Sequence, residues 1–188
     1  MNLNLKPGLI VGGIILLLVV LFGASYNDLV TKQENVDSKL SNISVQLERR
    51  ADLIPNLINT VKGYVNHEND VIDKITSARE RLLKADNMEE KLAINDELTS
   101  SLNNLFVIVE NYPDLKSNTN FLNLQDELAG TENRIATARH EYNEAVKEYN
   151  QAMKSFPKNI IAKLFGFKEK TYFENKESSY DVPEVNFD

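Results

Sequence analysis

The chain lacks cysteine and tryptophan altogether, and it has only seven glycines and five prolines among its 188 residues. The absence of cysteine excludes disulfide bonds, thiolate metal ligands and a cysteine nucleophile. Glycine and proline lie mostly near breaks in the apolar periodicity, which favours long helices over a sheet with many turns. We therefore expect an all-α protein.

Basic residues are also in short supply, because 21 lysines and arginines stand against 28 aspartates and glutamates, a formal charge of −7. A general nucleic-acid-binding protein needs a basic surface to meet the phosphates. We therefore expect no nucleic-acid partner. The length allows one folded domain of about 100 to 200 residues together with a membrane segment.

Charge is missing entirely from a stretch near the N-terminus. The 21 residues between Lys6 and Asp28 are uncharged, and residues 9–22 are all aliphatic or Phe apart from two glycines. A helix of this length spans the ~30 Å hydrocarbon layer of a bilayer. We assign residues 1–8 to a short N-terminal segment and residues 9–25 to a single transmembrane helix.

A cleaved signal peptide is the alternative for this stretch, because Gly23, Ala24 and Ser25 offer small residues for a cleavage site. The single Lys6 is a weak basic region for such a peptide, so we favour the uncleaved helix. Lysines lie on both sides of the stretch, so the positive-inside rule does not assign the side of the membrane that holds the rest of the chain.

Two heptad stripes predict long helices at the two ends of a bundle that covers residues 26–156. Within the first stripe Arg50 alone is not apolar, and Pro55 is expected to bend the helix. The first stripe consists of Val36, Leu40, Ile43, Leu47, Arg50, Ile54, Leu57, Val61 and Tyr64. The second consists of Phe121, Leu124, Leu128, Thr131, Ile135, Ala138, Tyr142, Ala145, Tyr149, Ala152 and Phe156.

Shorter apolar stripes predict two further helices between the long ones. Asn87, three residues before Glu90, is a candidate cap for the second of them, and Tyr112-Pro113-Asp114 is expected to end it. The first short stripe consists of Val71, Ile72, Ile75, Ala78, Leu82 and Leu83. The second consists of Ile94, Leu98, Leu102, Leu105 and Val109.

The two long stripes also have matching lengths. Residues 28–64 and residues 121–156 each give a helix about 55 Å long. We expect them to run antiparallel, with the short pair packed at the end far from the membrane and the last helix returning to it. The predicted fold is therefore a transmembrane helix followed by an elongated antiparallel bundle of two long and two short helices.

The C-terminal region changes the sign of its charge along the chain. From Lys154 to Lys170 there are five lysines and one glutamate, and we assign residues 157–170 to a basic amphipathic segment. Residues 171–188 carry five acidic residues and one lysine, which is typical of a charged strap or a disordered tail.

The basic amphipathic segment has two interpretations. It lies in the lipid headgroup layer with its apolar side chains inserted, or these side chains cover the base of the bundle. The candidates for contact with the membrane are Phe156, Ile160, Ile161, Lys163, Leu164, Phe165, Phe167 and Lys168.

Polar residues of the two long helices are expected to meet in the antiparallel register. If Arg50 is buried, it requires a partner, and the register places Glu132 beside it. We favour a structural network that holds the helices in register over a ligand site. The cluster consists of Arg49, Arg50 and Asp52 facing Glu132 and Arg134, with Asp126 or Arg139 nearby.

The remaining polar residues show no pattern of an enzyme. The two histidines, His67 and His140, are expected about 30 Å apart in the antiparallel bundle, which excludes one shared metal site. No glycine-rich phosphate loop, nucleophile elbow or nucleotide fingerprint occurs. We expect no catalytic residue, no metal and no cofactor.

Several blocks of the sequence resemble the LemA family, and together they cover nearly all of the chain after residue 25. The blocks are YN at 26–27, QLERRADLIPNL at 46–57, VKGY at 61–64, YPDLK at 112–116, QDEL at 125–128, TENRI at 131–135, AR at 138–139, YN at 142–143, FP at 156–157 and FGF at 165–167. The resemblance implies a bacterial inner or cell membrane protein with one span and an elongated antiparallel helical domain. It implies no established chemistry, and a related branch associated with magnetosome membranes implies a role in membrane organisation.

We therefore expect a membrane-anchored noncatalytic scaffold or adaptor of the bacterial cell envelope. Its expected partners are the lipid bilayer and other membrane or envelope proteins. The alternative is an envelope sensor that binds a small ligand through the Arg/Asp/Glu cluster, and an enzyme is a more distant third.

Overall fold

The computed structural model describes residues 7–65 and 68–173 of the chain. These residues form no strand, and their helices are α1 (Pro7–Lys62), α2 (Asn69–Lys84), α3 (Met88–Val109), α4 (Pro113–Lys116), α5 (Thr119–Lys154) and α6 (Lys158–Phe165). The expected all-α fold is confirmed. Most of the predicted N-terminal segment, His67 and the acidic tail beyond residue 173 lie outside the described residues.

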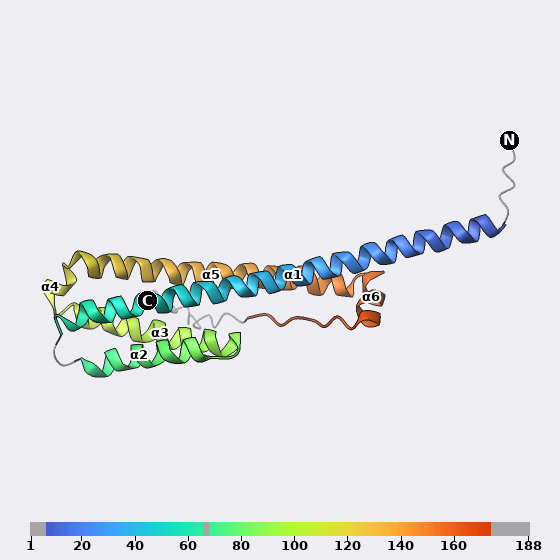
Figure 1. Cartoon of the computed structure of the whole chain (residues 1–188). Helices are drawn as coiled ribbons and strands as arrows, with labels where there is room; N and C mark the ends of the chain where they lie inside the picture. Colours follow the sequence, from blue (N-terminus) through green and yellow to red (C-terminus); the bar gives the residue numbers. More distant parts are fainter. Residues whose placement is uncertain (1–6, 66–67, 174–188) are drawn as a thin grey trace, which may run out of the picture.

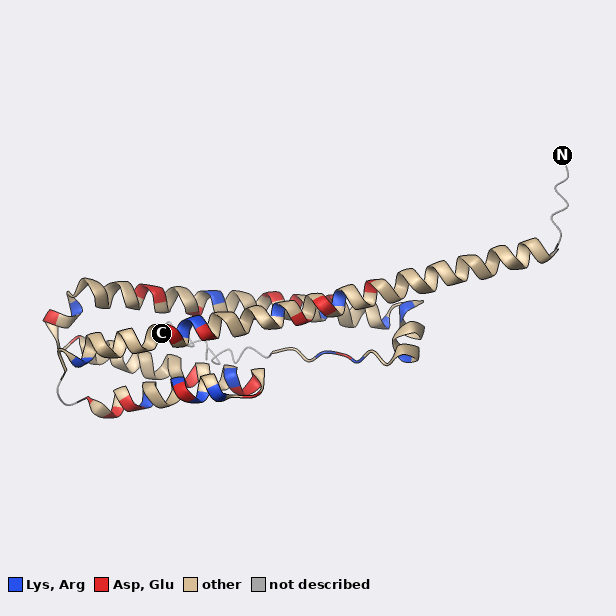
Figure 2. Ribbon diagram, in the orientation of Figure 1, with Lys and Arg blue, Asp and Glu red and all other residues tan. Residues whose placement is uncertain are grey.

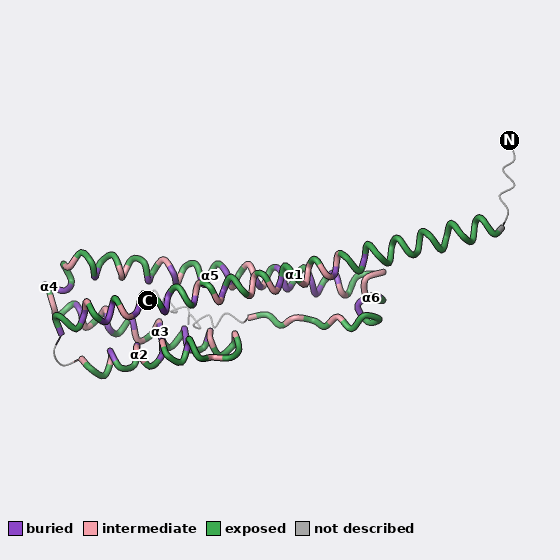
Figure 3. Tube along the Cα trace, viewed as in Figure 1, coloured by how far each residue is buried: buried purple, intermediate pink, exposed green. Residues whose placement is uncertain are grey.

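Helix α1 is one continuous helix of 56 residues, about 84 Å long. It joins the predicted transmembrane helix to the first bundle helix without a break. Residues 8–24 are exposed and burial begins at Ser25, so α1 enters the bundle where the apolar run ends (Figure 3). This first part of α1 projects beyond the other helices in Figure 1 and carries no charged residue in Figure 2. By length and composition it is able to cross a membrane, and its mean hydropathy reaches 2.6.

Helices α1 and α5 run antiparallel along the rest of the molecule (Figure 1). Lys32 Nζ lies 3.5 Å from Glu148 Oε2, and Lys39 Nζ lies 2.8 Å from Glu141 Oε2. Each step of seven residues forward on α1 is a step of seven residues backward on α5. The antiparallel pairing predicted from the matched stripes is confirmed.

The two predicted stripes form the core between these helices, with a correction at the end of each. Tyr64 is 39% exposed and Phe156 is 80% exposed. Both side chains follow the last residue of their helix, so the helical spacing no longer directs them inward. The Tyr64 hydroxyl instead accepts a hydrogen bond of 2.9 Å from Asn118 Nδ2.

Helices α2 and α3 pack beside the half of the α1–α5 pair that is far from the apolar run (Figure 1). Their predicted apolar stripes are buried except for the exposed Leu83 and the half-buried Val71. The predicted cap is confirmed, because Asn87 Oδ1 accepts a 2.8 Å hydrogen bond from the Glu90 N–H. The break predicted near Pro113 contains the short helix α4, which Pro113 begins and which the sequence pattern did not indicate.

Pro55 lies inside α1, and the helix continues through it. A residue with an N–H at this position would bond to the carbonyl of Ala51, so proline frees that carbonyl inside the core. Arg79 Nε of α2 donates a 2.8 Å hydrogen bond to the oxygen of Ala51. Helix α2 therefore supplies the donor that the proline lacks.

Helix α6 folds against the end of the bundle nearest the apolar run. Ile161 and Ala162 are buried against Leu29 of α1. The helix ends at Phe165, and the next residue, Gly166, has a φ of 74°, a left-handed conformation that suits glycine. Residues 167–173, here named the strap, then run in extended form back along the bundle (Figure 1).

Candidate functional site

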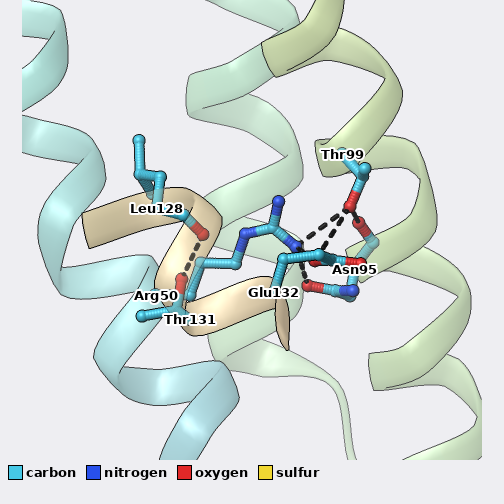
Figure 4. Close-up of polar contacts among 6 residues, drawn as sticks. All are labelled: Arg50, Asn95, Thr99, Leu128, Thr131 and Glu132. Carbon is cyan, nitrogen blue, oxygen red and sulfur yellow. Dashed lines mark hydrogen bonds and ion pairs between the residues drawn. The ribbon is translucent and has the colours of Figure 1, made fainter. Parts of the chain in front are cut away.

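The most deeply buried charged group of the described residues is the guanidinium of Arg50, which is 3% exposed. Helix α1 directs it between α3 and α5, where its Nη1 donates to Asn95 Oδ1 at 2.7 Å and to Thr99 Oγ1 at 2.9 Å. The same Nη1 donates to Glu132 Oε2 of α5 (Figure 4). The contact with Glu132 that the antiparallel register predicts is therefore present.

Burial and the neighbouring negative charge have opposite effects on the pKa of Arg50. Burial lowers the pKa of Arg50 below its ordinary value, while the negative charge of Glu132 and its hydrogen bond raise it. The guanidinium of an arginine stays charged at neutral pH in proteins. A buried cation therefore connects three helices, and its carboxylate partner is 41% exposed at the surface.

Helix α3 completes the network with polar side chains that the sequence did not indicate. Asn95 is 1% exposed although it lies among apolar residues of α3. The Thr99 hydroxyl lies 3.0 Å from the carbonyl of Asn95 and 3.3 Å from Glu132 Oε2. Asn95 and Thr99 become partners of Arg50 only because α3 packs beside α1 and α5. The register predicted from the sequence aligned only the two long helices, so it did not reveal them.

The other members of the predicted cluster do not converge on Arg50. Arg49 is exposed and its Nη2 lies 3.4 Å from Glu127 Oε2. Asp52 and Arg134 are exposed on the outer faces of α1 and α5. The predicted cluster therefore divides into a buried network around Arg50 and separate surface charges.

The buried network has the chemistry of a structural tie. All three acceptors of Nη1 belong to the chain itself, and Thr131, next to Glu132 on α5 in Figure 4, donates to the carbonyl of Leu128 at 2.8 Å. A hollow of about 630 Å³ lies elsewhere, between α1 and the strap, and Arg50 does not line it. This arrangement holds three helices together through Nη1, while Arg50 Nε is buried without a hydrogen-bond partner among the described residues.

The predicted membrane-interface residues divide between core and surface. Ile161 is buried, and Phe167 is half-buried against Tyr26, with ring centroids 5.8 Å apart, so both are corrected from lipid contacts to packing contacts. Their burial arises because α6 folds back onto α1. The side chains that remain exposed are Phe156, Ile160, Lys163, Leu164, Phe165 and Lys168.

The histidines give no metal site within the described part of the chain. His140 is exposed on α5, and His67 lies outside the described residues. Among residues 7–65 and 68–173, no group of three or more His, Asp or Glu side chains is arranged to hold a metal ion.

A model of the LemA family matches residues 39–187, which is most of the bundle and the C-terminal region. The chain belongs to the LemA family. The resemblance noted in the sequence blocks is thereby confirmed.

Relatives of this chain come from several bacteria. Magnetosome protein MamQ 2 of Paramagnetospirillum magneticum is 30% identical over 184 aligned positions, covering 84% of this chain and 67% of the relative. Magnetosome protein MamQ of Magnetospirillum gryphiswaldense is 29% identical with the same coverage. Protein LemA of Metamycoplasma hominis is 25% identical over 152 positions, covering 80% of this chain and 69% of the relative. Together with the apolar part of α1, these relatives indicate a LemA-like, membrane-associated protein.

Proposed function

We propose that this member of the LemA family is a noncatalytic scaffold of the bacterial cell envelope. One pass of α1 anchors it in the cell membrane, and the bundle stands on the membrane as a helical rod that presents its sides to other envelope proteins. The position of α6 carries this proposal, because it places exposed apolar side chains at the level where the apolar part of α1 ends.

The geometry of α6 supports contact with lipid. The ring of Phe165 lies 4.9 Å from that of Tyr26, which is four residues beyond Phe22 at the end of the apolar run. Leu164 of α6 is 70% exposed, and Phe156, two residues before α6, is 80% exposed. Large apolar side chains this exposed are favourable in the boundary between headgroups and acyl chains, since burial there removes them from water.

Lysines frame this apolar surface. Lys158 Nζ lies 2.7 Å from Asp28 Oδ2, and Lys163 and Lys168 are exposed on either side of Phe165. Lysines near an anionic bilayer surface contribute about 1 kcal/mol each to binding. The exposed side chains of α6 and its flanks therefore form what we name the foot, consisting of Phe156, Ile160, Lys163, Leu164, Phe165 and Lys168.

Tryptophan fluorescence tests the foot, because the natural chain contains no tryptophan. The variant Phe165→Trp, reconstituted into vesicles that contain brominated and anionic lipids, is expected to emit at short wavelength and to be quenched by the bromine. The control is Val107→Trp, since Val107 is 70% exposed on α3 in the far half of the bundle. It is expected to emit like an indole in water and to remain unquenched.

Equal quenching of the two variants would mean that the bundle lies flat on the bilayer, and an unquenched Trp at position 165 would reject the foot. The anchor has its own test. The intact mass of protein extracted from membranes is expected to include residues 1–25, whereas a chain that begins near Tyr26 would show a cleaved signal peptide.

The scaffold itself is tested by its partners. A photo-crosslinking residue in place of Val107 is expected to give discrete protein adducts in intact membranes, and these adducts should persist in an Arg50→Met background. A chain that melts like the parent but loses the adducts when Arg50 is replaced would favour the alternative, a sensor that binds a small ligand at the arginine cluster. Absence of adducts from several exposed positions would overturn the scaffold.

A further inference from the structure

A repeated pair of residues on α5 makes a regular set of hydrogen bonds to the strap. The sequence Glu-Tyr-Asn occurs at residues 141–143 and again at residues 148–150, one heptad later. Both tyrosines lie in the core stripe, whereas each asparagine lies one residue further around the helix, at the edge of the core. The strap passes along this edge.

Each asparagine holds one residue of the strap by its main chain. Asn150 Nδ2 donates to the carbonyl of Lys170 at 2.9 Å, and Asn150 Oδ1 accepts from the N–H of Lys170 at 3.0 Å. Asn143 makes the same pair of bonds with Phe173, at 2.8 Å and 2.9 Å. The side-chain amide therefore takes the place that a neighbouring strand would take in a sheet.

The tyrosines add a second set of main-chain bonds with the same spacing. The Tyr149 hydroxyl donates to the carbonyl of Lys168 at 3.1 Å, and the Tyr142 hydroxyl donates to the carbonyl of Thr171 at 3.0 Å. One heptad on α5 therefore corresponds to three residues of strap for both the tyrosines and the asparagines.

This correspondence follows from the geometry of the two chain forms. Seven residues of helix advance about 10.5 Å at 1.5 Å per residue. Three residues of extended chain advance about 10 Å at about 3.3 Å per residue. A Tyr-Asn pair repeated every heptad therefore stays in step with an extended main chain that runs antiparallel to the helix.

Side chains of the strap make fewer contacts than its main chain. The ring of Phe173 stacks on Tyr142 with centroids 4.6 Å apart, and Lys170 Nζ lies 2.7 Å from Asp37 Oδ1. Lys168, Glu169, Thr171 and Tyr172 are exposed. Two further side-chain contacts join Glu169 Oε2 to Lys154 Nζ at 3.2 Å and the ring of Phe167 to that of Tyr26. The six main-chain bonds outnumber these four side-chain contacts, so recognition of the extended backbone is a large part of how the surface holds the strap.

We propose that the repeated Tyr-Asn pairs of α5 form a binding site for the main chain of an extended peptide, which this protein fills with its own strap. An extended segment of another protein occupies the site when the strap is released. The site is independent of the proposed scaffold role, since it requires neither the membrane foot nor a partner at Val107.

The experiment uses the full chain in detergent, with the strap released by the substitutions Lys170→Pro and Phe173→Pro. These remove the two N–H groups that donate hydrogen bonds to Asn150 and Asn143. A labelled peptide of residues 167–173 is expected to bind this chain saturably in fluorescence anisotropy and to bind the wild-type chain at least about tenfold more weakly, because the strap occupies the site. Adding Asn150→Leu to the released chain removes two hydrogen bonds and is expected to weaken binding of the peptide about tenfold.

Matched peptides test the recognition of the main chain. A peptide with Lys170→Pro loses the N–H bond to Asn150 and the ion pair with Asp37, and is expected to bind about tenfold more weakly. A peptide with Glu169→Pro also loses one ion pair, with Lys154, but none of the main-chain bonds, and is expected to bind nearly as well as the parent peptide. Equal binding of the two peptides, or binding that ignores Asn150→Leu, would overturn the proposal.

A second measurement does not depend on the folding of the proline variants. In the wild-type chain, hydrogen exchange is expected to be slow at the N–H of Lys170 and Phe173 and fast at those of Glu169 and Tyr172. Excess unlabelled peptide should remove the protection at both slow positions. Protection that the peptide leaves unchanged, in a chain whose variants also bind no peptide, would reject an exchangeable site.

Discussion

The half of the bundle far from the membrane segment covers the α1–α5 pair with two helices, whereas the near half covers it with the strap and α6. In the far half, apolar side chains of α2 and α3 meet the core, and Arg50 reaches across to α3 and α5. In the near half, asparagines and tyrosines of α5 hold a main chain. The same pair of long helices is therefore covered by side-chain packing in one half and by a hydrogen-bonded main chain in the other.

The difference has a consequence for stability. A helix packed by its side chains buries a wide apolar stripe, and its loss exposes a large area. A strap held mainly by hydrogen bonds exchanges them for bonds to water when it leaves, so each bond contributes only about 0.5 to 1.5 kcal/mol. We therefore expect the far half to set the global stability and the near half to open locally.

The largest effect is expected at the network of the far half. Glu132→Ala leaves the buried cation of Arg50 without its carboxylate and should lower the free energy of unfolding by about 3 to 5 kcal/mol. Arg50→Met should cost less, about 1 to 3 kcal/mol, because the half-exposed Glu132 can be hydrated and mainly Asn95 loses a partner. Denaturant unfolding of the full chain in detergent measures both.

The surface pair provides the control for that comparison. Glu127→Ala removes the exposed partner of Arg49 and is expected to cost under about 1 kcal/mol. The double variant of Arg50→Met with Glu132→Ala should cost clearly less than the sum of the single variants. Additive losses would show that the two residues are not coupled.

A smaller effect is expected where α2 compensates for Pro55. Arg79→Ala leaves the buried carbonyl of Ala51 without a donor and should cost about 1 to 3 kcal/mol. In a Pro55→Ala background the new N–H supplies that donor, so the same replacement should cost much less. Arg81→Ala, which removes an exposed ion pair with Glu97, is the control. Equal costs of Arg79→Ala in both backgrounds would contradict the compensation.

Alkaline pH should weaken the near half. Burial, and then the charge of Asp37, raise the pKa of both Tyr142 and Tyr149 above the ordinary value. A raised folded pKa means that their contribution to stability is complete below the ordinary tyrosine pKa of about 10 and is lost as pH rises through the folded pKa. Hydrogen exchange of the strap should therefore accelerate above about pH 10 beyond its intrinsic pH dependence.

The double variant Tyr142→Phe with Tyr149→Phe separates this effect from general alkaline unfolding. In this variant hydrogen exchange of the strap should be faster at neutral pH, because two hydrogen bonds are lost. It should show no additional acceleration above about pH 10, because phenylalanine rings do not ionise. Tyr112 provides a far-half comparison, since its hydrogen bond to Glu68, and then its desolvation, raise its pKa as well. Replacement of Tyr112 by Phe should leave the strap's pH response unchanged.

The smallest expected effect concerns the register of the helix pair. Lys39→Glu or Glu141→Lys places like charges together and should cost up to about 1 kcal/mol, whereas the double exchange should restore most of it. Melting temperatures at low and high salt measure the difference, which salt should reduce. A double exchange that adds the two losses would contradict the antiparallel register.

Prediction from sequence succeeded where a periodic stripe met a similar stripe. The heptads containing Ile43 and Ala138 specify which face of each long helix is buried, and a capping pair such as Asn87 and Glu90 is local in the chain. Prediction failed just beyond the ends of helices and at polar contacts between helices. Tyr64 and Phe156 continue the numerical pattern beyond their helices, and Asn95 acquires its partner from a helix 45 residues away.

The sequence alone determined the helical class, the apolar run, the antiparallel pairing and the family, because each depends on spacing along one helix or on contiguous blocks of residues. Only the tertiary structure decided that Ile161 turns inward, that Asn95 and Thr99 meet Arg50, and that Asn143 and Asn150 hold the strap. The physical reason is that an extended segment and a polar contact between helices have no period of their own. Their partners are chosen by the fold that surrounds them.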